Sequence, residues 1–376
     1  MSSKKLIFIL IFGLQSGLAI SQSLFRRYFD NLINDTTDIS KPQFLVYPTV
    51  AYAPETSWEL GLSSLLVYYA KRDTTNRLSE ISGFTFFTLQ SQYGFWFDHA
   101  IYSDQDKWFF LGRLRFQSFP LKYHGIGIDS PRDYLALVEA NQILIKERVL
   151  RELRPNLYFG VEADFQRMAN VDFIPSSEAF DFPLPVGSEG STNFGLGVGM
   201  VYDDRHNVLN VRNGHFAELA FLNYSSALSS YGFKAVLMDT RIFRPVGKNG
   251  VLAWQAIGQF YSGNVPFNHL SLLGGDSMMR GYYLGRFRDR NQLATQLEFR
   301  MLPLPLGFSK RIGAAVFAGS GTVFPELSLE SINKMVWSAG GGLRFLLFPK
   351  KDIYTRFDVA FTREGSGFYL FIGEAF

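Results

Sequence analysis

The feature that most constrains the fold is a strict alternation of polar and apolar residues over unusually long segments. Between Gln292 and Met301, one set of positions includes Gln296, Glu298 and Arg300, and the positions between them are mainly apolar. Such alternation places the two sets on opposite faces of a β-strand. A soluble β-sandwich alternates as well, but these segments run for about ten to fifteen residues, against about five or six in globular sheets. That length is typical of a tilted strand that crosses a membrane.

The same pattern repeats along most of the chain. It is clear in 107–119, 157–168 and 352–363, where charged residues share one face and aromatic or aliphatic residues the other. Turn signals divide the region 44–376 into sixteen expected strands, an even number that suits a closed antiparallel barrel. Their expected bounds are 44–54, 57–70, 80–92, 93–102, 107–119, 134–153, 156–172, 193–204, 214–226, 231–244, 250–262, 290–302, 309–324, 335–348, 351–363 and 367–376.

The connections between these strands fall into two classes. The short ones are rich in proline or glycine, whereas 120–133, 173–192 and 263–289 are long. Short turns at one end and long loops at the other are typical of outer-membrane barrels, whose long loops face outward.

Composition agrees with an exported all-β protein. The aromatic share reaches 16%, through 38 Phe and 18 Tyr, and the chain has no cysteine, which excludes disulfides and thiol catalysis. A net charge of +3 gives no indication of a nucleic-acid surface. The sequence therefore predicts an all-β protein, a transmembrane antiparallel β-barrel in contact with lipid and not with nucleic acid.

Enzyme motifs are missing from the sequence. The five histidines are scattered, and no G-x-S-x-G elbow, H-E-x-x-H motif or phosphate-binding loop occurs. Mixed charges at alternating positions fit the polar lining of a barrel better than an acid/base site. We therefore expect no enzymatic activity, no cofactor and no metal.

The N-terminal region has the pattern of an export signal. Two lysines precede an apolar run and small residues follow, which predicts a signal peptide over 1–21, with an N-terminal membrane anchor as the alternative. Apolar residues then recur at helical spacing, so 22–43 is expected to hold a short amphipathic periplasmic helix and linker. The barrel is expected over 44–376.

The long connection 263–289 differs in composition from its surroundings. Its stretch 274–289, GGDSMMRGYYLGRFRD, is rich in glycine and arginine and longer than a turn requires. Arg280 carries a planar cation that can hold a carboxylate through two hydrogen bonds. A solvated surface arginine is the alternative interpretation.

Several residues of this stretch carry a family resemblance, namely Gly274, Gly275, Ser277, Arg280, Gly281 and Tyr282. They resemble the GG…S…RG(F/Y) signature of the sixth extracellular loop in the BamA/TamA superfamily of outer-membrane barrels, also called bacterial surface antigens. In that family the loop folds into the lumen and its arginine meets acidic groups on the inner wall. The segment 22–43 is too short for a periplasmic POTRA domain of this family, so we expect a short member without POTRA domains.

A strand segment further along resembles the same family. The sequence 317–321, FAGSG, is similar to the F-x-D-x-G strand motif, with Gly319 in place of the aspartate. A guanidinium without a partner in a narrow lumen would be unfavourable. Glu298, which the alternation places on the inward face, is the remaining candidate, and we predict a contact between Arg280 and Glu298.

The stretch 202–214, YDDRHNVLNVRNG, resembles the periplasmic turn D-(T/S)-R-(D/N)-N…P…G of these barrels. The aspartates of such a turn can accept hydrogen bonds from turn amides while the arginine pairs with them. A metal site that includes His206 is the alternative, although no further ligand pattern follows. The residues that carry the resemblance are Asp203, Asp204, Arg205 and Gly214.

The chain ends in FYLFIGEAF, on an aromatic residue. Ile372, Gly373 and Phe376 resemble the I-G-x-x-aromatic C-terminal signal of the superfamily. We expect the strand 367–376 to close the cylinder against the first strand. An ordinary last strand of a soluble sheet is the alternative.

The resemblance implies a role in outer-membrane protein insertion or transport, through a weak seam between 47–52 and 368–376. Pro48 and Pro54 would weaken ladder pairing on the first strand. The implied location is the outer membrane of a Gram-negative bacterium, which the chain crosses many times, with outer-membrane lipid and other outer-membrane proteins as neighbours or clients. A passive or plugged pore and a structural, partner-docking barrel are the alternatives, and the oligomeric state stays open.

Overall fold

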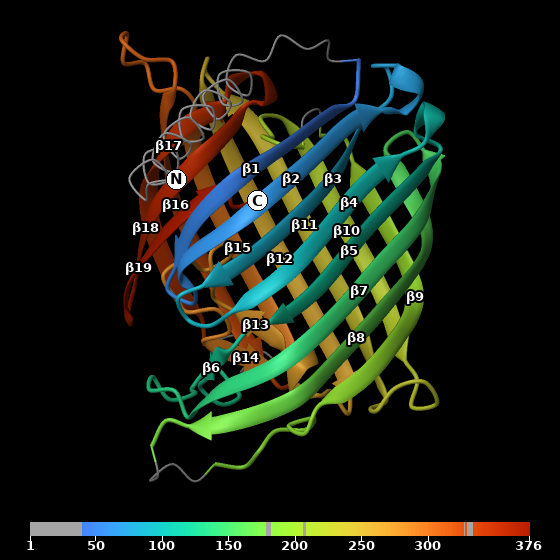
Figure 1. Ribbon diagram of the computed structural model, residues 1–376, viewed down its shortest axis with the longest axis vertical. Helices are drawn as coiled ribbons and strands as arrows, with labels where there is room; N and C mark the ends of the chain where they lie inside the picture. Colours follow the sequence, from blue (N-terminus) through green and yellow to red (C-terminus); the bar gives the residue numbers. More distant parts are fainter. Residues whose placement is uncertain (1–39, 178–181, 206–207, 327, 329–333) are drawn as a thin grey trace, which may run out of the picture.

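A computed structural model describes residues 40–177, 182–205, 208–326, 328 and 334–376. The predicted signal peptide, 1–21, and most of the predicted helical segment 22–43 lie outside the described residues. Within the described part, sixteen long antiparallel strands form a closed barrel (Figure 1), as the alternation predicts.

The long strands have the following bounds: β1 (Gln43–Ala53), β2 (Ser57–Tyr69), β3 (Leu78–Thr88), β4 (Tyr93–Tyr102), β5 (Trp108–Ser118), β7 (Ala136–Arg154), β8 (Leu157–Pro175), β9 (Ser191–Asp203), β10 (Gly214–Tyr224), β11 (Phe233–Val246), β12 (Gly250–Gly263), β15 (Asn291–Met301), β16 (Ile312–Phe324), β17 (Val336–Phe348), β18 (Ile353–Thr362) and β19 (Gly365–Ile372). Three short strands lie in the long connections: β6 (Leu121–Tyr123), β13 (Ser271–Leu273) and β14 (Phe287–Asp289). Four 3-10 turns are Ala70–Arg72, Asp104–Asp106, Phe267–His269 and Pro349–Lys351 among the residues described.

Neighbours in the barrel are neighbours in sequence. Each long strand pairs with the next, and β19 pairs back with β1 to complete the circle. The short strand β6 adds to the edge of β7, and β13 pairs with β14 in a separate hairpin. The expected division of 80–102 into two strands is confirmed, because β3 ends at Thr88 and β4 begins at Tyr93.

The two faces of the strands differ as the alternation requires. On β2, the side chains of Trp58 and Leu60 are 46% and 42% exposed, whereas Glu59 between them is 5% exposed. The exposed apolar side chains face outward along the barrel, and a surface of this size and chemistry is suited to lipid. None of the helical segments described is long and apolar enough to cross a membrane.

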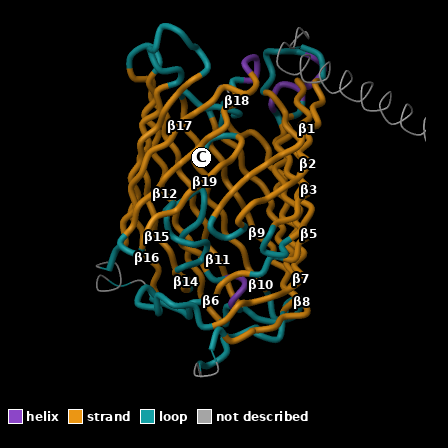
Figure 2. Tube along the Cα trace, turned by 60° about the vertical axis from the view of Figure 1, so that its left-hand side comes forward, coloured by secondary structure: helices purple, strands orange, loops and turns teal. Residues whose placement is uncertain are grey.

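Backbone segments, as well as side chains of the strands, lie within the lumen. Figure 2 shows loop segments inside the ring of strands, together with the C-terminal end. These segments are the connection 264–290, here called the lumen loop, and residues 373–376, here called the C-terminal tail. The expectation that the last strand runs to Phe376 is wrong, because β19 ends at Ile372 and the tail turns inward.

Candidate functional site

The lumen loop is built on a small hairpin with an apolar underside. Leu273 at the end of β13 and Phe287 at the start of β14 have no exposed surface. Met279 and Tyr282, between the two strands, are 1% exposed and belong to the same buried cluster as Ala294 on β15. Apolar burial therefore fixes the position of the loop inside the barrel.

The tip of the loop is also held by backbone contacts. The Gly275 amide donates to the Tyr282 carbonyl at 3.0 Å, which closes the loop on itself. Further along, the Gln296 side chain donates to the Ser277 carbonyl at 2.8 Å. A main-chain carbonyl of the loop is thus bound by a side chain of β15, in addition to the apolar contacts.

Gly281 places the loop directly against β18 and β19. Its φ of +102° favours glycine, and an added Cβ would lie 2.7 Å from a methyl group of Thr362. Its amide donates to the Tyr369 hydroxyl at 2.8 Å. A side chain at this position would push the loop away from the last two strands.

Arg280 is buried and bound by two carboxylates. One terminal nitrogen lies 2.5 Å from Glu298 on β15, and the other lies 2.7 Å from Asp358 on β18. The guanidinium carbon lies 3.4 Å from the ring centre of Phe317 on β16. The predicted contact with Glu298 is present, and Asp358 is a second partner that the sequence motif did not indicate.

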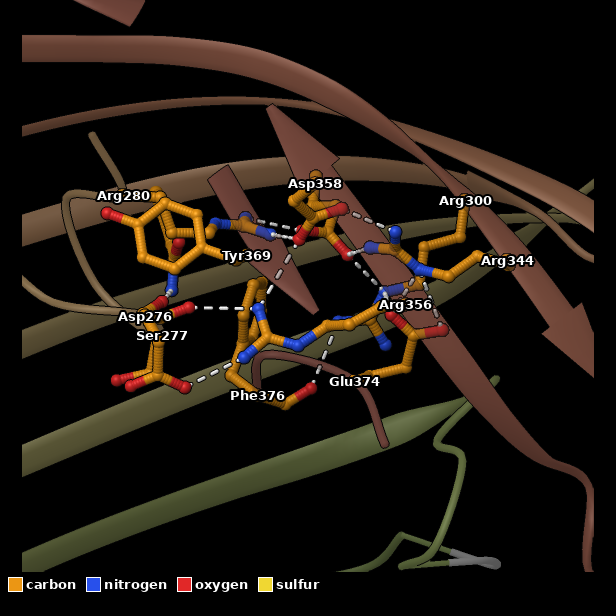
Figure 3. A network of polar contacts seen from close by, with 12 residues as sticks. Asp276, Ser277, Arg280, Arg300, Arg344, Arg356, Asp358, Tyr369, Glu374 and Phe376 are labelled. Carbon is orange, nitrogen blue, oxygen red and sulfur yellow. Dashed lines mark hydrogen bonds and ion pairs between the residues drawn. The ribbon is translucent and has the colours of Figure 1, made fainter. Parts of the chain in front are cut away.

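Arg280 belongs to a larger charge network within the described lumen (Figure 3). Its members are Arg280, Arg300, Arg344, Arg356, Asp276, Glu298, Asp358 and Glu374. Arg344 on β17 joins Asp358 at 2.5 Å to Glu374 of the tail at 2.9 Å, and Arg300 lies 2.7 Å from Glu298. Each buried charge therefore has an opposite charge beside it, which offsets its desolvation.

The C-terminal tail ends inside this network. Gly373 leaves the strand with a φ of +95°, a conformation that favours glycine, and its amide donates to the Tyr354 carbonyl at 2.7 Å. The Phe376 carbonyl accepts a hydrogen bond from Arg300 at 3.0 Å, and its ring centre lies 6.1 Å from that of Phe243. The last four residues are consequently unavailable for pairing with β1.

The seam between β1 and β19 is closed by little hydrogen bonding. Their register contains one residue pair, Tyr52 with Leu370, supported by the Tyr52 and Phe368 rings at 5.3 Å. By contrast, β1 pairs with β2 along its whole length. Thr49, Val50 and Ala51, which precede Tyr52 in β1, have no register partner on β19 among the described residues.

The predicted periplasmic turn also forms a polar cluster. Asp203 is fully buried and accepts from the Arg205 amide at 3.0 Å and its side chain at 2.9 Å. Asp204 pairs with His215 at 3.0 Å, beside Gly214 at the start of β10. Burial raises the pKa of the Asp204 carboxyl, but hydrogen bonds from His215 outweigh this effect and hold the pKa below its usual range.

This cluster gives no support for the alternative metal site. His206 lies outside the described residues, and Asp203 is already neutralised by Arg205. Among the residues described, no group of three or more His, Asp or Glu side chains could hold a metal ion.

Three comparisons place the fold among known proteins. Residues 84–376 match the Omp85 superfamily domain, and no curated protein matches the sequence significantly. The structure is similar to a crystal structure of BamA from Haemophilus ducreyi lacking POTRA domains 1–3, with a TM-score of 0.57 and 14% identity, over 88% of this chain and 70% of that chain.

Two structures of CdiB are similar in the same way. CdiB from Acinetobacter baumannii has a TM-score of 0.54 and 9% identity, over 89% of this chain and 59% of that chain. CdiB from Escherichia coli has a TM-score of 0.53 and 11% identity, over 92% and 69%. At these identities the likeness shows the fold, whereas the family match extends over most of the chain, and the protein therefore belongs to the Omp85 superfamily of outer-membrane β-barrels.

Proposed function

We propose that the protein inserts or transports outer-membrane proteins through the seam between β1 and β19. Membership of the Omp85 superfamily implies a location in the outer membrane of a Gram-negative bacterium, where such clients are found. The observation that carries the proposal is the single residue pair, Tyr52 with Leu370, that joins the two strands. A strand edge with free backbone groups is a template on which another strand can add.

The C-terminal tail supports this mechanism. Pairing between β19 and β18 continues to Ile372, but the residues after it are held in the lumen by Arg300 and Arg344. These contacts keep residues 373–376 from extending the seam along β1. Moving the tail would change the seam without breaking the continuous ladders elsewhere in the barrel.

A disulfide across the seam tests the proposal. The chain has no cysteine, so the double variant Tyr52→Cys/Leu370→Cys introduces the only thiols. These residues are register partners, which suits disulfide geometry. We expect the oxidised protein, reconstituted in lipid vesicles, to lose most of its ability to speed the folding of an unfolded outer-membrane protein, and reduction to restore it.

A matched control comes from the neighbouring hairpin. The variant Val50→Cys/Leu60→Cys also joins register partners with outward-facing side chains, but between β1 and β2. This disulfide should leave activity unchanged. Equal activity of the oxidised and reduced seam variant would contradict the proposal, and ion conductance without any effect on client folding would favour a pore.

A further inference from the structure

A separate cavity lies between the lumen loop and the wall formed by β1 to β4. Its volume is about 330 Å³, and it extends from the β1–β2 turn to the end of β19. The charged residues that line it are Glu55, Glu59 and Asp276. No lysine, arginine or histidine is among its described lining residues.

The three carboxylates differ in how they are compensated. Asp276 is paired with Arg356 at 2.8 Å. One oxygen of Glu55 accepts a hydrogen bond from the Leu284 amide at 2.6 Å. Within the described part of the chain, the Glu59 carboxylate has neither a hydrogen bond nor an ion pair, although Glu59 is only 5% exposed and lines the cavity.

The lack of a partner for the Glu59 carboxylate is unusual for a buried acid among the described residues of this barrel. A carboxylate removed from water is unfavourable unless a cation or hydrogen-bond donors compensate it. Burial raises the pKa of the nearby Glu55 carboxyl to about 7, so the protein leaves this acid poorly compensated as well. A cation that entered the cavity would supply what these two side chains lack.

The remaining lining determines the kind of cation. Among the described residues, five aromatic side chains line the cavity: Tyr47, Phe84, Trp96, Phe119 and Phe371. Aromatic faces attract ammonium and guanidinium groups, whereas a divalent metal ion requires a shell of several oxygens. Arg115 already lies over the Trp96 ring at 4.8 Å, so this wall binds one guanidinium within the protein itself.

We propose that the cavity binds an organic cation with an apolar body, its charged group between Glu55 and Glu59 and its body against the aromatic side chains. The chemistry is that of an alkyl- or arylammonium ion, or of a lysine or arginine side chain on a peptide. The site does not depend on the proposed role in protein insertion, because it can be tested with the purified barrel alone.

The first test compares two small probes of nearly equal shape. Phenethylammonium and its neutral counterpart 2-phenylethanol are titrated into the purified protein in detergent micelles, with binding followed by calorimetry. We expect saturable binding of the ammonium ion, at least about tenfold tighter than that of the alcohol, the equivalent of about 1.4 kcal/mol. Equal affinity for the two probes, or no saturable binding, would overturn the proposal without the use of any variant.

Two variants locate the site. Glu59→Gln keeps the shape of the side chain and should weaken phenethylammonium binding by about tenfold or more, with little effect on 2-phenylethanol. Glu80→Gln changes a carboxylate that lines a different lumen cavity and should leave both affinities unchanged. Unchanged ammonium binding by a folded Glu59→Gln protein would place the cation elsewhere and contradict the assignment.

A third titration identifies the source of the cation. A short peptide with one lysine is compared with the same peptide carrying norleucine at that position. Tighter binding of the lysine peptide than of phenethylammonium would indicate a peptide side chain as the occupant. Binding of phenethylammonium with no lysine dependence among the peptides would indicate a free organic amine, and both results support the same site chemistry.

Discussion

The two walls that meet at the seam compensate charge in different ways. On β15 to β18, buried arginines and carboxylates alternate, and Arg280 of the lumen loop is held between Glu298 and Asp358. On β1 to β4, the lumen face carries aromatic side chains and the uncompensated Glu59. The lumen loop is thus clamped by ion pairs to one wall and borders a cavity at the other.

This difference teaches how a closed barrel can have one weak position. The C-terminal tail could extend the ladder between β19 and β1, but its Glu374 is bound to Arg344 on the clamped side. The opposite side is held by the β1–β2 ladder and by the contact of Glu55 with Leu284. Separation at the seam therefore requires few hydrogen bonds to break, whereas separation at any continuous ladder requires many.

The largest effect should follow from removing the clamp. Arg280→Ala removes one of the cations beside the buried carboxylates of Glu298 and Asp358. Arg344 stays in contact with both carboxylates, so the loss is expected at the lower end of the range for a broken buried pair, about 3 kcal/mol. Arg280→Lys should recover only part of this stability. It restores the positive charge, but one ammonium group cannot bind both carboxylates as the forked guanidinium does. Urea unfolding in detergent micelles, followed by tryptophan fluorescence, measures both.

The control for this prediction is another arginine near the same loop. Arg290 lies 4.0 Å from Glu326 and its side chain is 38% exposed, so Arg290→Ala should change the unfolding free energy by less than about 1 kcal/mol. Similar losses for Arg280→Ala and Arg290→Ala would remove the distinction between the clamped wall and the rest of the lumen.

A smaller effect should be confined to the seam. Glu374→Gln removes the charge that holds the tail to Arg344, at a cost of about 1–3 kcal/mol, since Asp358 and Glu298 remain. A cysteine at Ala375 should then react several-fold faster with a water-soluble maleimide. Glu326→Gln, at an exposed side chain, is the matched control, and equal labelling rates would show that Glu374 does not retain the tail.

The smallest effect should depend on pH. The Glu55 carboxyl has a pKa of about 7 in the folded protein and about 4.3 when unfolded, so the folded state holds its proton more tightly. Stability conferred by this proton is complete below about pH 4 and is lost as the pH rises through 7. Glu55→Gln should therefore stabilise the barrel by on the order of 1 kcal/mol at pH 8 and have little effect at pH 4. A difference that is constant across this range would exclude Glu55 as the titrating group.

Much of this organisation can be predicted from the sequence because β-strands have a period of two. Alternation and turn signals together predict the sixteen strands, and alternation places Glu298 on the inward face, where it meets Arg280. The alternation in 352–363 puts the charged residues, Asp358 among them, on one face. It does not show which inward residues of β15 and β18 converge on one loop. The face on which a side chain lies follows from the sequence of its own strand. The pairing of Arg280 with Asp358 depends on how the loop and distant strands come together in the barrel.

The C-terminal tail was missed for a related reason. The sequence from Phe368 to the end reads as one continuous strand, and only the polar Glu374 departs from an apolar pattern. Its partner, Arg344, lies on a different strand, so the ion pair that draws the tail inward has no local signature. The short strands β13 and β14 are likewise stabilised by burial inside the lumen.

Hydrogen exchange tests the central claim most directly. The amides of Thr49, Val50 and Ala51 in β1 are compared with those of β12, which is paired on both sides from Gly250 to Phe260. If the seam is closed by the Tyr52–Leu370 pair alone, those of the three β1 amides that are directed away from β2 should exchange at least about a hundredfold faster than the amides of β12. Equal protection of the two strands would contradict the account.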